Sequence, residues 1–160
     1  MNIRNYLPSD EQRVREILVS NIPKFFVMED MKMLDTWLSA QNAGVVAYPP
    51  ATADYFFVLQ ATNVIGCAGF YVLDNEKRVP LTWGMVDDAY HNNGYGKLLF
   101  QYRVNEIKKL YPDYRITLGT SQHTFRFFEK LEMKVESITP NGYGNNFDKY
   151  FMYLQEKNTD

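Results

Sequence analysis

A short stretch rich in glycine and amide side chains holds the clearest chemical potential in this 160-residue chain. It follows an apolar run over residues 79–86, precedes an amphipathic run that ends at Leu110, and reads His91-Asn92-Asn93-Gly94-Tyr95-Gly96-Lys97. A strand that leads through a glycine turn into a helix leaves several N–H groups unpaired at the positive end of the helix dipole. Such a helix start binds phosphate, and glycine lets the backbone approach a ligand closely. The stretch therefore predicts an anion site.

The spacing excludes two common phosphate-binding loops. A P-loop has Gly five residues before its Gly-Lys pair and Ser or Thr after it, but His91 and Leu98 hold those positions. A dinucleotide-binding loop has a third glycine where Leu99 stands. The remaining pattern is a basic or polar residue, two residues, Gly, one residue and Gly.

Composition and charge set broad limits on the protein. A hydrophobic fraction of 46% and an aromatic fraction of 16% suffice for the core of one domain, which we expect to span residues 1–160. The net charge of −2 gives no general attraction to nucleic acid or to a membrane surface. With no signal-like segment and no long apolar run, we expect a cytoplasmic protein. The single Cys67 excludes an internal disulfide, and its apolar strand setting favours a buried hydrophobe over a nucleophile.

Periodicity and turn residues predict eleven elements in the order βααβββαβαββ. The expected strands cover residues 3–7, 54–60, 63–73, 79–86, 115–119, 133–138 and 148–154. The expected helices run from Pro8 to before Pro23 with Ser9 as cap, over 28–41, from the glycine turn to Leu110, and over 121–131 with Ser121 as cap. Residues 141–146 should join the last two strands. This order indicates an α+β fold, a sheet covered by helices.

Two segments resemble the GNAT family of N-acetyltransferases. The family's acyl-CoA loop reads Arg or Gln, x, x, Gly, x, Gly or Ala, and His91 takes its first place. About 25 residues on, the distance of a helix and a strand, the family reads Asn-x-x-Ala-x-x-Phe-Tyr-x-x-x-Gly-Phe. Phe127 matches this second motif, whereas Ser121, Thr124 and Phe128 replace Asn, Ala and Tyr. The family shares the same element order, so the resemblance implies a mixed, mostly antiparallel central sheet of about seven strands flanked by four helices.

The resemblance also implies a co-substrate, acetyl-CoA, and no metal. In the family, the glycine-loop strand splays from the next strand and pantetheine lies between them; here these are residues 79–86 and 115–119. Gly84, Met85 and Val86 would then pair with the pantetheine amides. The diphosphate would be held at the turn by His91, Asn92, Asn93, Gly94, Tyr95, Gly96, Lys97 and Leu98. The remaining cofactor contacts would come from Ser121, Thr124, Phe127 and Phe128.

The catalytic groups are less well defined than the cofactor site. A backbone N–H near Val86 would stabilise the oxyanion, a task that needs a positioned donor. The Tyr proposed as general acid in many relatives is Phe128 here, which cannot donate a proton. Either another donor acts, with Ser121, His123, Tyr143 and Tyr150 as candidates, or none is needed because a thiol of pKa about 8.5 leaves readily as thiolate. No residue is assigned as base, since Asp87, Asp88 and a water relay are equal candidates.

The acceptor is predicted to be an amine. Aromatic residues in the 21–26 loop and in the last hairpin favour a small molecule, an amino acid or a peptide. The sequence has no acidic cluster that would bind a polycation, so polycationic acceptors are disfavoured. The sequence leaves a homodimer open. The main alternative is a catalytically degenerate acyl-CoA-binding module, and a nucleotide-dependent enzyme is disfavoured by the missing P-loop residues.

Overall fold

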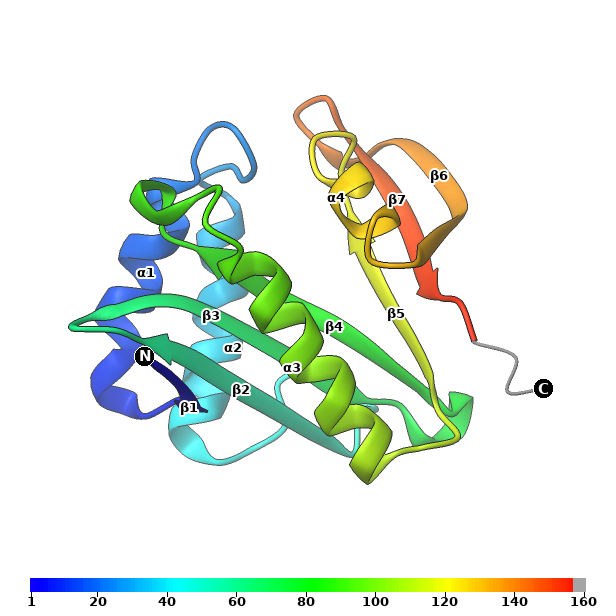
Figure 1. Cartoon of the computed structure of the whole chain (residues 1–160), viewed down its shortest axis with the longest axis horizontal. Helices are drawn as coiled ribbons and strands as arrows, with labels where there is room; N and C mark the ends of the chain where they lie inside the picture. The colour runs from blue at the N-terminus through cyan, green and yellow to red at the C-terminus, as the bar shows by residue number, and fades with distance from the viewer. Residues whose placement is uncertain (157–160) are drawn as a thin grey trace.

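A seven-stranded sheet with helices on both faces forms the protein, in a computed structural model that describes residues 1–156 (Figure 1). The strands are β1 (Asn2–Asn5), β2 (Ala53–Gln60), β3 (Val64–Val72), β4 (Arg78–Val86), β5 (Arg115–Thr120), β6 (Met133–Gly144) and β7 (Phe147–Leu154). The helices are α1 (Glu11–Ser20), α2 (Asp30–Ala43), α3 (Tyr95–Leu110) and α4 (Phe125–Glu129). The expected element order and helix count are confirmed. No helix in the described chain is long and apolar enough to cross a bilayer.

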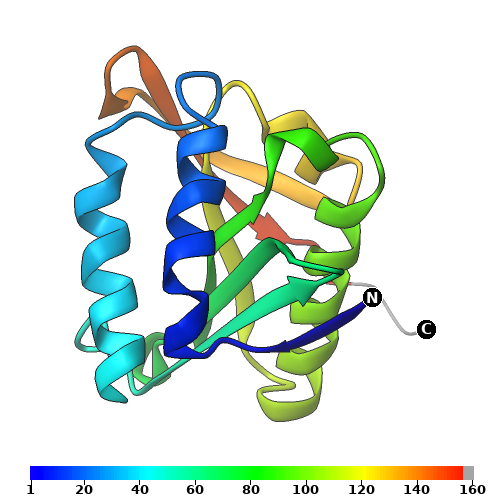
Figure 2. The same ribbon diagram turned by 90° about the vertical axis from the view of Figure 1, so that its left-hand side faces the viewer.

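The sheet order is β1-β2-β3-β4-β5-β7-β6, and only the β4–β5 pair is parallel. Figure 2 shows α1 and α2 on one face and α3 on the other. The helices pack there through apolar stripes at helical spacing. On the first face these stripes include Ile17, Leu34 and Trp37, which pack on Phe56 of β2; on the second they include Phe100, Ile107 and, from α4, the half-buried Phe128.

The parallel pair separates along its length. Hydrogen-bonded register joins Arg78 through Leu81 to Arg115 through Leu118 and goes no further. Beyond this point β4 stays with β3 while β5 continues with β7, so the two strands diverge in Figure 1. At the divergence β4 carries a bulge, because the register with β3 shifts between Cys67 and Gly69 and Trp83 has a φ of 49°. The splay implied by the resemblance is therefore present.

Two helix starts differ from the sequence prediction. Ser9 lies inside a short 3-10 turn, and Asp10 is the residue at the N-cap of α1. The last helix begins at Phe125 rather than Ser121, because Ser121 is held in a turn. Its hydroxyl accepts the N–H of His123 at 3.2 Å, and its carbonyl accepts the N–H of Phe125 at 3.1 Å. Five residues are all that remain of the expected 121–131 helix.

The last strand pair is longer than predicted. Instead of ending at Ile138, β6 runs to Gly144, and only Asn145 and Asn146 form the turn into β7. Both asparagines have positive φ, 54° and 65°, the conformation that two-residue hairpins require. The amide-rich segment looked like a loop because Asn and Gly mark turns, yet most of it is paired or bulged strand.

Candidate active site

The glycine turn presents unpaired backbone donors, as predicted. Gly94 is the N-cap of α3 with a φ of 82°, and Asn92 is also left-handed at 65°. The N–H groups of residues 92–97 have no hydrogen-bond partner within residues 1–156. No acidic residue lies in the first turn of α3, and Lys97 is exposed there. This arrangement of N–H groups and helix dipole suits a diphosphate.

A small cavity of about 50 Å³ lies beside this turn, at the place where β4 has separated from β5. Three elements line it: Gly84, Met85 and Val86 from β4, Gly96, Leu99 and Arg103 from α3, and Phe127 and Phe128 from α4. Six of these eight residues were predicted from the sequence. Two glycines leave room for a ligand, since a Cβ at Gly96 would lie 3.3 Å from the Phe127 ring and one at Gly84 would lie 2.8 Å from Arg103.

Val86 turns its backbone polar groups toward the gap. Asp87 donates its N–H to the Ile65 carbonyl of β3 at 2.8 Å, so the neighbouring Val86 lies at a position that is not hydrogen-bonded to β3. Its carbonyl instead accepts from Asn21 Nδ2 at 2.9 Å and contacts His91 Nε2 at 2.8 Å. A carbonyl only accepts, so the His91 Nε2 carries the hydrogen. The Val86 N–H has no partner within the described chain.

His91 is held inside the protein rather than directed outward. Besides the Val86 carbonyl, the imidazole ring contacts the Asp88 carboxylate at 3.5 Å and the Phe25 ring, with the ring centroids 5.7 Å apart. The backbone N–H of His91 donates to the Asp88 backbone carbonyl. These contacts fix the entry to the glycine turn on the end of β4. Positioning the turn is thus the role that the geometry of His91 favours.

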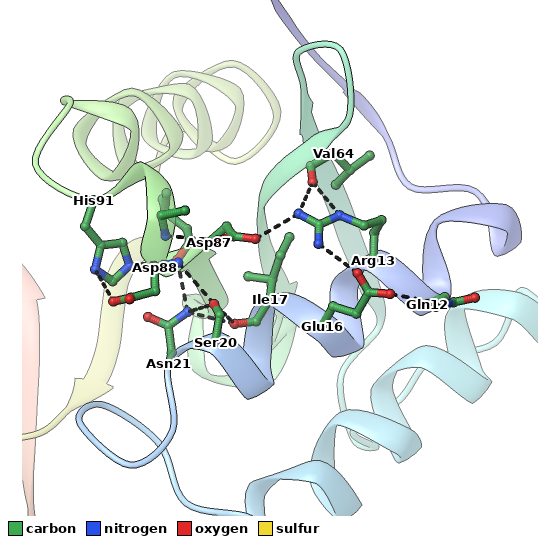
Figure 3. Close-up of polar contacts among 12 residues, drawn as sticks. Gln12, Arg13, Glu16, Ile17, Ser20, Asn21, Val64, Asp87, Asp88 and His91 are labelled. Atoms are coloured by element: carbon green, nitrogen blue, oxygen red, sulfur yellow. Dashed lines mark hydrogen bonds and ion pairs between the residues drawn. The ribbon is translucent and has the colours of Figure 1, made fainter.

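An ion pair fastens the end of β4 to α1. Arg13 donates to Asp87 at 2.9 Å and also to the Val64 carbonyl, and Ser20 Oγ accepts the Asp88 N–H at 3.0 Å (Figure 3). Burial alone would raise the pKa of the Asp87 carboxyl, but hydrogen bonds from Arg13 and the Ala89 N–H outweigh burial and hold the pKa below its ordinary value. The charged form of Asp87 therefore stabilises the fold next to the site.

Replacing Asp87 should expose this stabilisation as a dependence on pH. We expect Asp87→Asn to lower the free energy of unfolding by about 1–3 kcal/mol at pH 7, because it removes a charge-assisted hydrogen bond. The folded-state pKa is depressed, so the contribution is complete above the unfolded pKa of about 3.9 and is lost as pH falls through the folded value. Urea unfolding at several pH values should show the difference shrinking in acid. Asp113→Asn, at an exposed carboxylate, is the control and should show no difference at any pH.

Three further predicted site residues, Ser121, Thr124 and Tyr150, do not line the cavity. The buried Ser121 has its hydroxyl engaged with the His123 N–H, and Thr124 Oγ1 contacts Thr120 Oγ1. Tyr150 stacks on Phe125 with ring centroids 4.3 Å apart. Phe128 does line the cavity and packs against Phe100 and Phe127.

Cys67 is a buried structural residue, as expected. It has no exposed surface, and its thiol contacts the Trp83 carbonyl at 3.4 Å next to the β4 bulge. Burial raises the pKa of the thiol to about 12, so no thiolate forms near neutral pH. No group of three or more His, Cys, Asp or Glu within residues 1–156 could hold a metal ion.

Sequence reasoning missed two residues at the centre of the site. Arg103 lies on the buried stripe of α3, four residues from both Leu99 and Ile107, and a charge at that spacing was a usable signal. Asn21 follows α1 and holds the Val86 carbonyl across 65 positions of sequence. No local pattern could reveal that contact.

Comparison with known proteins identifies the family. The sequence profile of the acetyltransferase (GNAT) family matches residues 12–133, which is most of the chain. This protein belongs to that family. At the sequence level no curated protein matches.

Solved structures share the fold over nearly their whole length. An acetyltransferase of the GNAT family from Staphylococcus aureus is 22% identical, with a TM-score of 0.73 over 98% of this chain and 99% of that one. A ribosomal-protein-alanine N-acetyltransferase from Brucella melitensis is 13% identical, with a TM-score of 0.74 over 98% and 100%. A protein from Salmonella typhimurium that is assigned as an acetyltransferase was solved with its cofactor acetyl-CoA; it is 19% identical, with a TM-score of 0.71 over 100% and 96%. Identities this low show a common fold and leave the acceptor open.

Proposed function

We propose that the protein is an acetyl-CoA-dependent N-acetyltransferase whose acceptor is the amine of a small molecule, an amino acid or a peptide. One observation carries the proposal. The unpaired N–H groups of residues 92–97 lie at the start of α3, and Gly96 among them lines the cavity formed where β4 has left β5. A phosphate-binding turn joined to a narrow slot suits a ligand with a diphosphate and a thin arm.

Each part of the site would act on a different part of acetyl-CoA, which supplies an acetyl group activated as a thioester. The turn would hold the diphosphate through N–H groups. Gly84 and Gly96 leave space for the pantetheine arm, and the outward N–H of Val86 would stabilise negative charge on the thioester oxygen. Asn21 and His91 hold the Val86 carbonyl, which belongs to the next peptide unit along the chain, and so restrain the backbone beside this donor.

The acceptor would approach from the face covered by α1 and α2. Aromatic side chains meet there: Trp83 stacks on Phe26 with centroids 6.4 Å apart and donates to the Tyr48 hydroxyl at 3.0 Å. Tyr143 reaches from β6 over Gly119, where its hydroxyl leaves no room for a Cβ. Burial and the charge of Asp30 raise the pKa of Tyr143 to about 12, so its hydroxyl keeps its proton. These surfaces favour an amine that carries a flat or apolar group.

The reported acceptors of fold relatives differ widely. Three similar structures are those of a spermidine N-acetyltransferase, an aminoglycoside 6'-N-acetyltransferase and a ribosomal-protein-alanine N-acetyltransferase. All three names describe acetylation of an amine, which supports amine acetylation as the reaction class. We also propose a cytoplasmic location, consistent with a single buried thiol and no disulfide.

Two measurements test the proposed function in sequence. Acetyl-CoA should raise the melting temperature, because a ligand that binds only the folded state stabilises it. Thiol release should then be followed over a panel of primary amines, including aromatic amines, amino acids and alanine-terminated peptides. No stabilisation by acetyl-CoA would refute the proposal at its first step.

The absence of a tyrosine at Phe128 favours one alternative, an acyl-CoA-binding module without catalysis. Such a protein would be stabilised by acetyl-CoA yet release no CoA with any amine. Thiol release above the uncatalysed rate with even one amine excludes it.

A further inference from the structure

Arg103 is the only ionisable side chain in the wall of the cavity, and it is only 4% exposed. Three backbone carbonyls accept from it: Leu99 from Nε at 3.3 Å, Gly69 from Nη1 at 3.2 Å and Thr82 from Nη1 at 3.5 Å. No carboxylate within residues 1–156 forms an ion pair with it. A buried cation without an anion is costly, and a ligand that brings negative charge to the cavity would offset that cost.

The remaining donors of Arg103 face the place where a ligand would lie. Nη2 is the guanidinium nitrogen closest to Gly84, 2.8 Å from where a Cβ would be, and it donates to no group of the described chain. Gly84 is one of the β4 residues at the cavity and stands two residues before Val86. The free edge of the guanidinium therefore borders the cavity beside the proposed oxyanion donor.

The charge of Arg103 persists at neutral pH. Burial lowers the pKa of its guanidinium to about 10, which still leaves it cationic at pH 7. Within residues 1–156, Cys67 on β3 is the titratable group that could offset this charge, but its thiol stays neutral near pH 7 because burial raises the pKa to about 12. The cavity thus contains a fixed positive charge that no neighbouring side chain cancels.

We propose that Arg103 stabilises the thiolate of CoA, a task left open by the loss of the acidic tyrosine at Phe128. This inference rests on the proposed function. In acetyl transfer, the amine lone pair forms the C–N bond, the C–S bond breaks with its electron pair kept on sulfur, and the amine proton passes to water. Arg103 keeps its own proton and stabilises the sulfur anion by charge.

Position along α3 favours the sulfur over the diphosphate as the partner of Arg103. Arg103 lies eight residues after Tyr95, the first residue of α3, so it is about 12 Å farther along the helix axis from the glycine turn. The diphosphate would be held at the helix start by the N–H groups of residues 92–97. The thioester end of the same molecule would lie near Gly84 and Val86, which is where the Nη2 group points.

The test compares binding of CoA with binding of desulfo-CoA, which lacks the thiol, over a range of pH by calorimetry. If binding lowers the pKa of the CoA thiol, the affinity of CoA relative to desulfo-CoA rises with pH. The rise is about tenfold for each unit by which the pKa is lowered, and it is complete near the pKa of the free thiol, about 8.5. We expect a gain of about 10- to 100-fold for the wild type between pH 6 and 9. This readout needs no acceptor and no turnover.

Three variants separate charge from structure. Arg103→Gln keeps an amide donor without charge and should abolish the gain, and Arg103→Lys keeps a charge and should retain part of it. Arg103→Met provides a second neutral replacement, because exchanging a buried cation for an apolar chain of similar length is often tolerated. Because Arg103 lines the cavity, each variant is judged by its own ratio of CoA to desulfo-CoA affinity at each pH, which a uniform loss of affinity for both ligands does not change.

Each outcome bears on a different claim. A flat ratio of CoA to desulfo-CoA affinity in the wild type, or an undiminished gain in either folded neutral variant, overturns the role of Arg103. Absence of binding of both ligands to the wild type overturns the proposed function and, with it, this inference. The role of Arg103 is supported if the pH-dependent gain in CoA affinity over desulfo-CoA is lost in the two neutral variants and partly kept in Arg103→Lys.

Discussion

Gly94→Glu should abolish acetyl-CoA binding while the protein stays folded. Gly94 is the N-cap of α3 and has nothing within 4 Å of where a Cβ would lie, so a longer side chain meets open space. That space is where the proposed diphosphate would sit, and a carboxylate there opposes it. Like charges in contact cost several kcal/mol, which corresponds to a loss of at least about 100-fold in affinity. Calorimetry with acetyl-CoA measures this affinity directly.

A second glycine supplies a matched control. Gly44 ends α2 away from the turn, with a φ of 70° against 82° at Gly94, and a Cβ there also meets nothing within 4 Å. Gly44→Glu therefore carries the same charge and similar backbone strain, about 1–3 kcal/mol in each case. Both variants should lose similar stability, and only Gly94→Glu should lose binding. Equal affinity in the two variants would show that the ligand does not sit at the glycine turn.

The sequence sufficed for the parts of the fold that local patterns determine. Helical spacing of apolar residues predicts α2 and α3 to within a few residues, and Gly94 marks the turn because its left-handed backbone suits glycine. Six of the cavity residues were among the predicted cofactor contacts: Gly96, Phe127 and Phe128 through the two motifs, and Gly84, Met85 and Val86 through the place of β4 in the family resemblance. These features depend on neighbours in sequence, which is why they could be predicted.

The missing parts depend on contacts between distant segments. Trp83 adopts a positive φ that its own type disfavours, because a bulge in β4 and packing against Phe26 and Tyr48 impose it. Likewise, Ser121 looked like a helix cap until its turn was fixed, while the adjacent Gln122 bonds to the β6–β7 hairpin at Asn146 and Asp148. Such tertiary effects override local propensity and leave no mark in a single sequence.

The largest effect on stability should follow from Trp37→Ala. Trp37 is fully buried between α2 and the sheet, with Phe56 and Tyr48 rings at 5.6 and 5.5 Å and its own ring close against Gly69. Removing an indole from such a site leaves a cavity and costs about 3–5 kcal/mol. That is a large share of the roughly 5–15 kcal/mol that holds a typical domain together. Urea denaturation at pH 7 should show it as a shift in midpoint.

Trp37→Phe separates packing from polarity at the same position. Trp37 Nε1 is a buried N–H with no hydrogen-bond partner within residues 1–156. An unpaired buried donor costs about 1–3 kcal/mol, so its removal offsets part of the volume lost. We therefore expect Trp37→Phe to change the free energy of unfolding by about 1 kcal/mol or less. A loss as large as that of Trp37→Ala would mean that the indole N–H is paired in solution.

The same pair of variants tests how the core supports the acceptor face. Trp37 packs against Tyr48, and Tyr48 accepts the hydrogen bond from Trp83 at 3.0 Å beside the β4 bulge. Loss of the indole should let Tyr48 and Trp83 move while the glycine turn, which none of these three side chains contacts in the described chain, stays in place. In Trp37→Ala at a temperature where it remains folded, acetyl-CoA affinity should therefore match the wild type. The KM for an accepted amine should rise, and Trp37→Phe should show neither change.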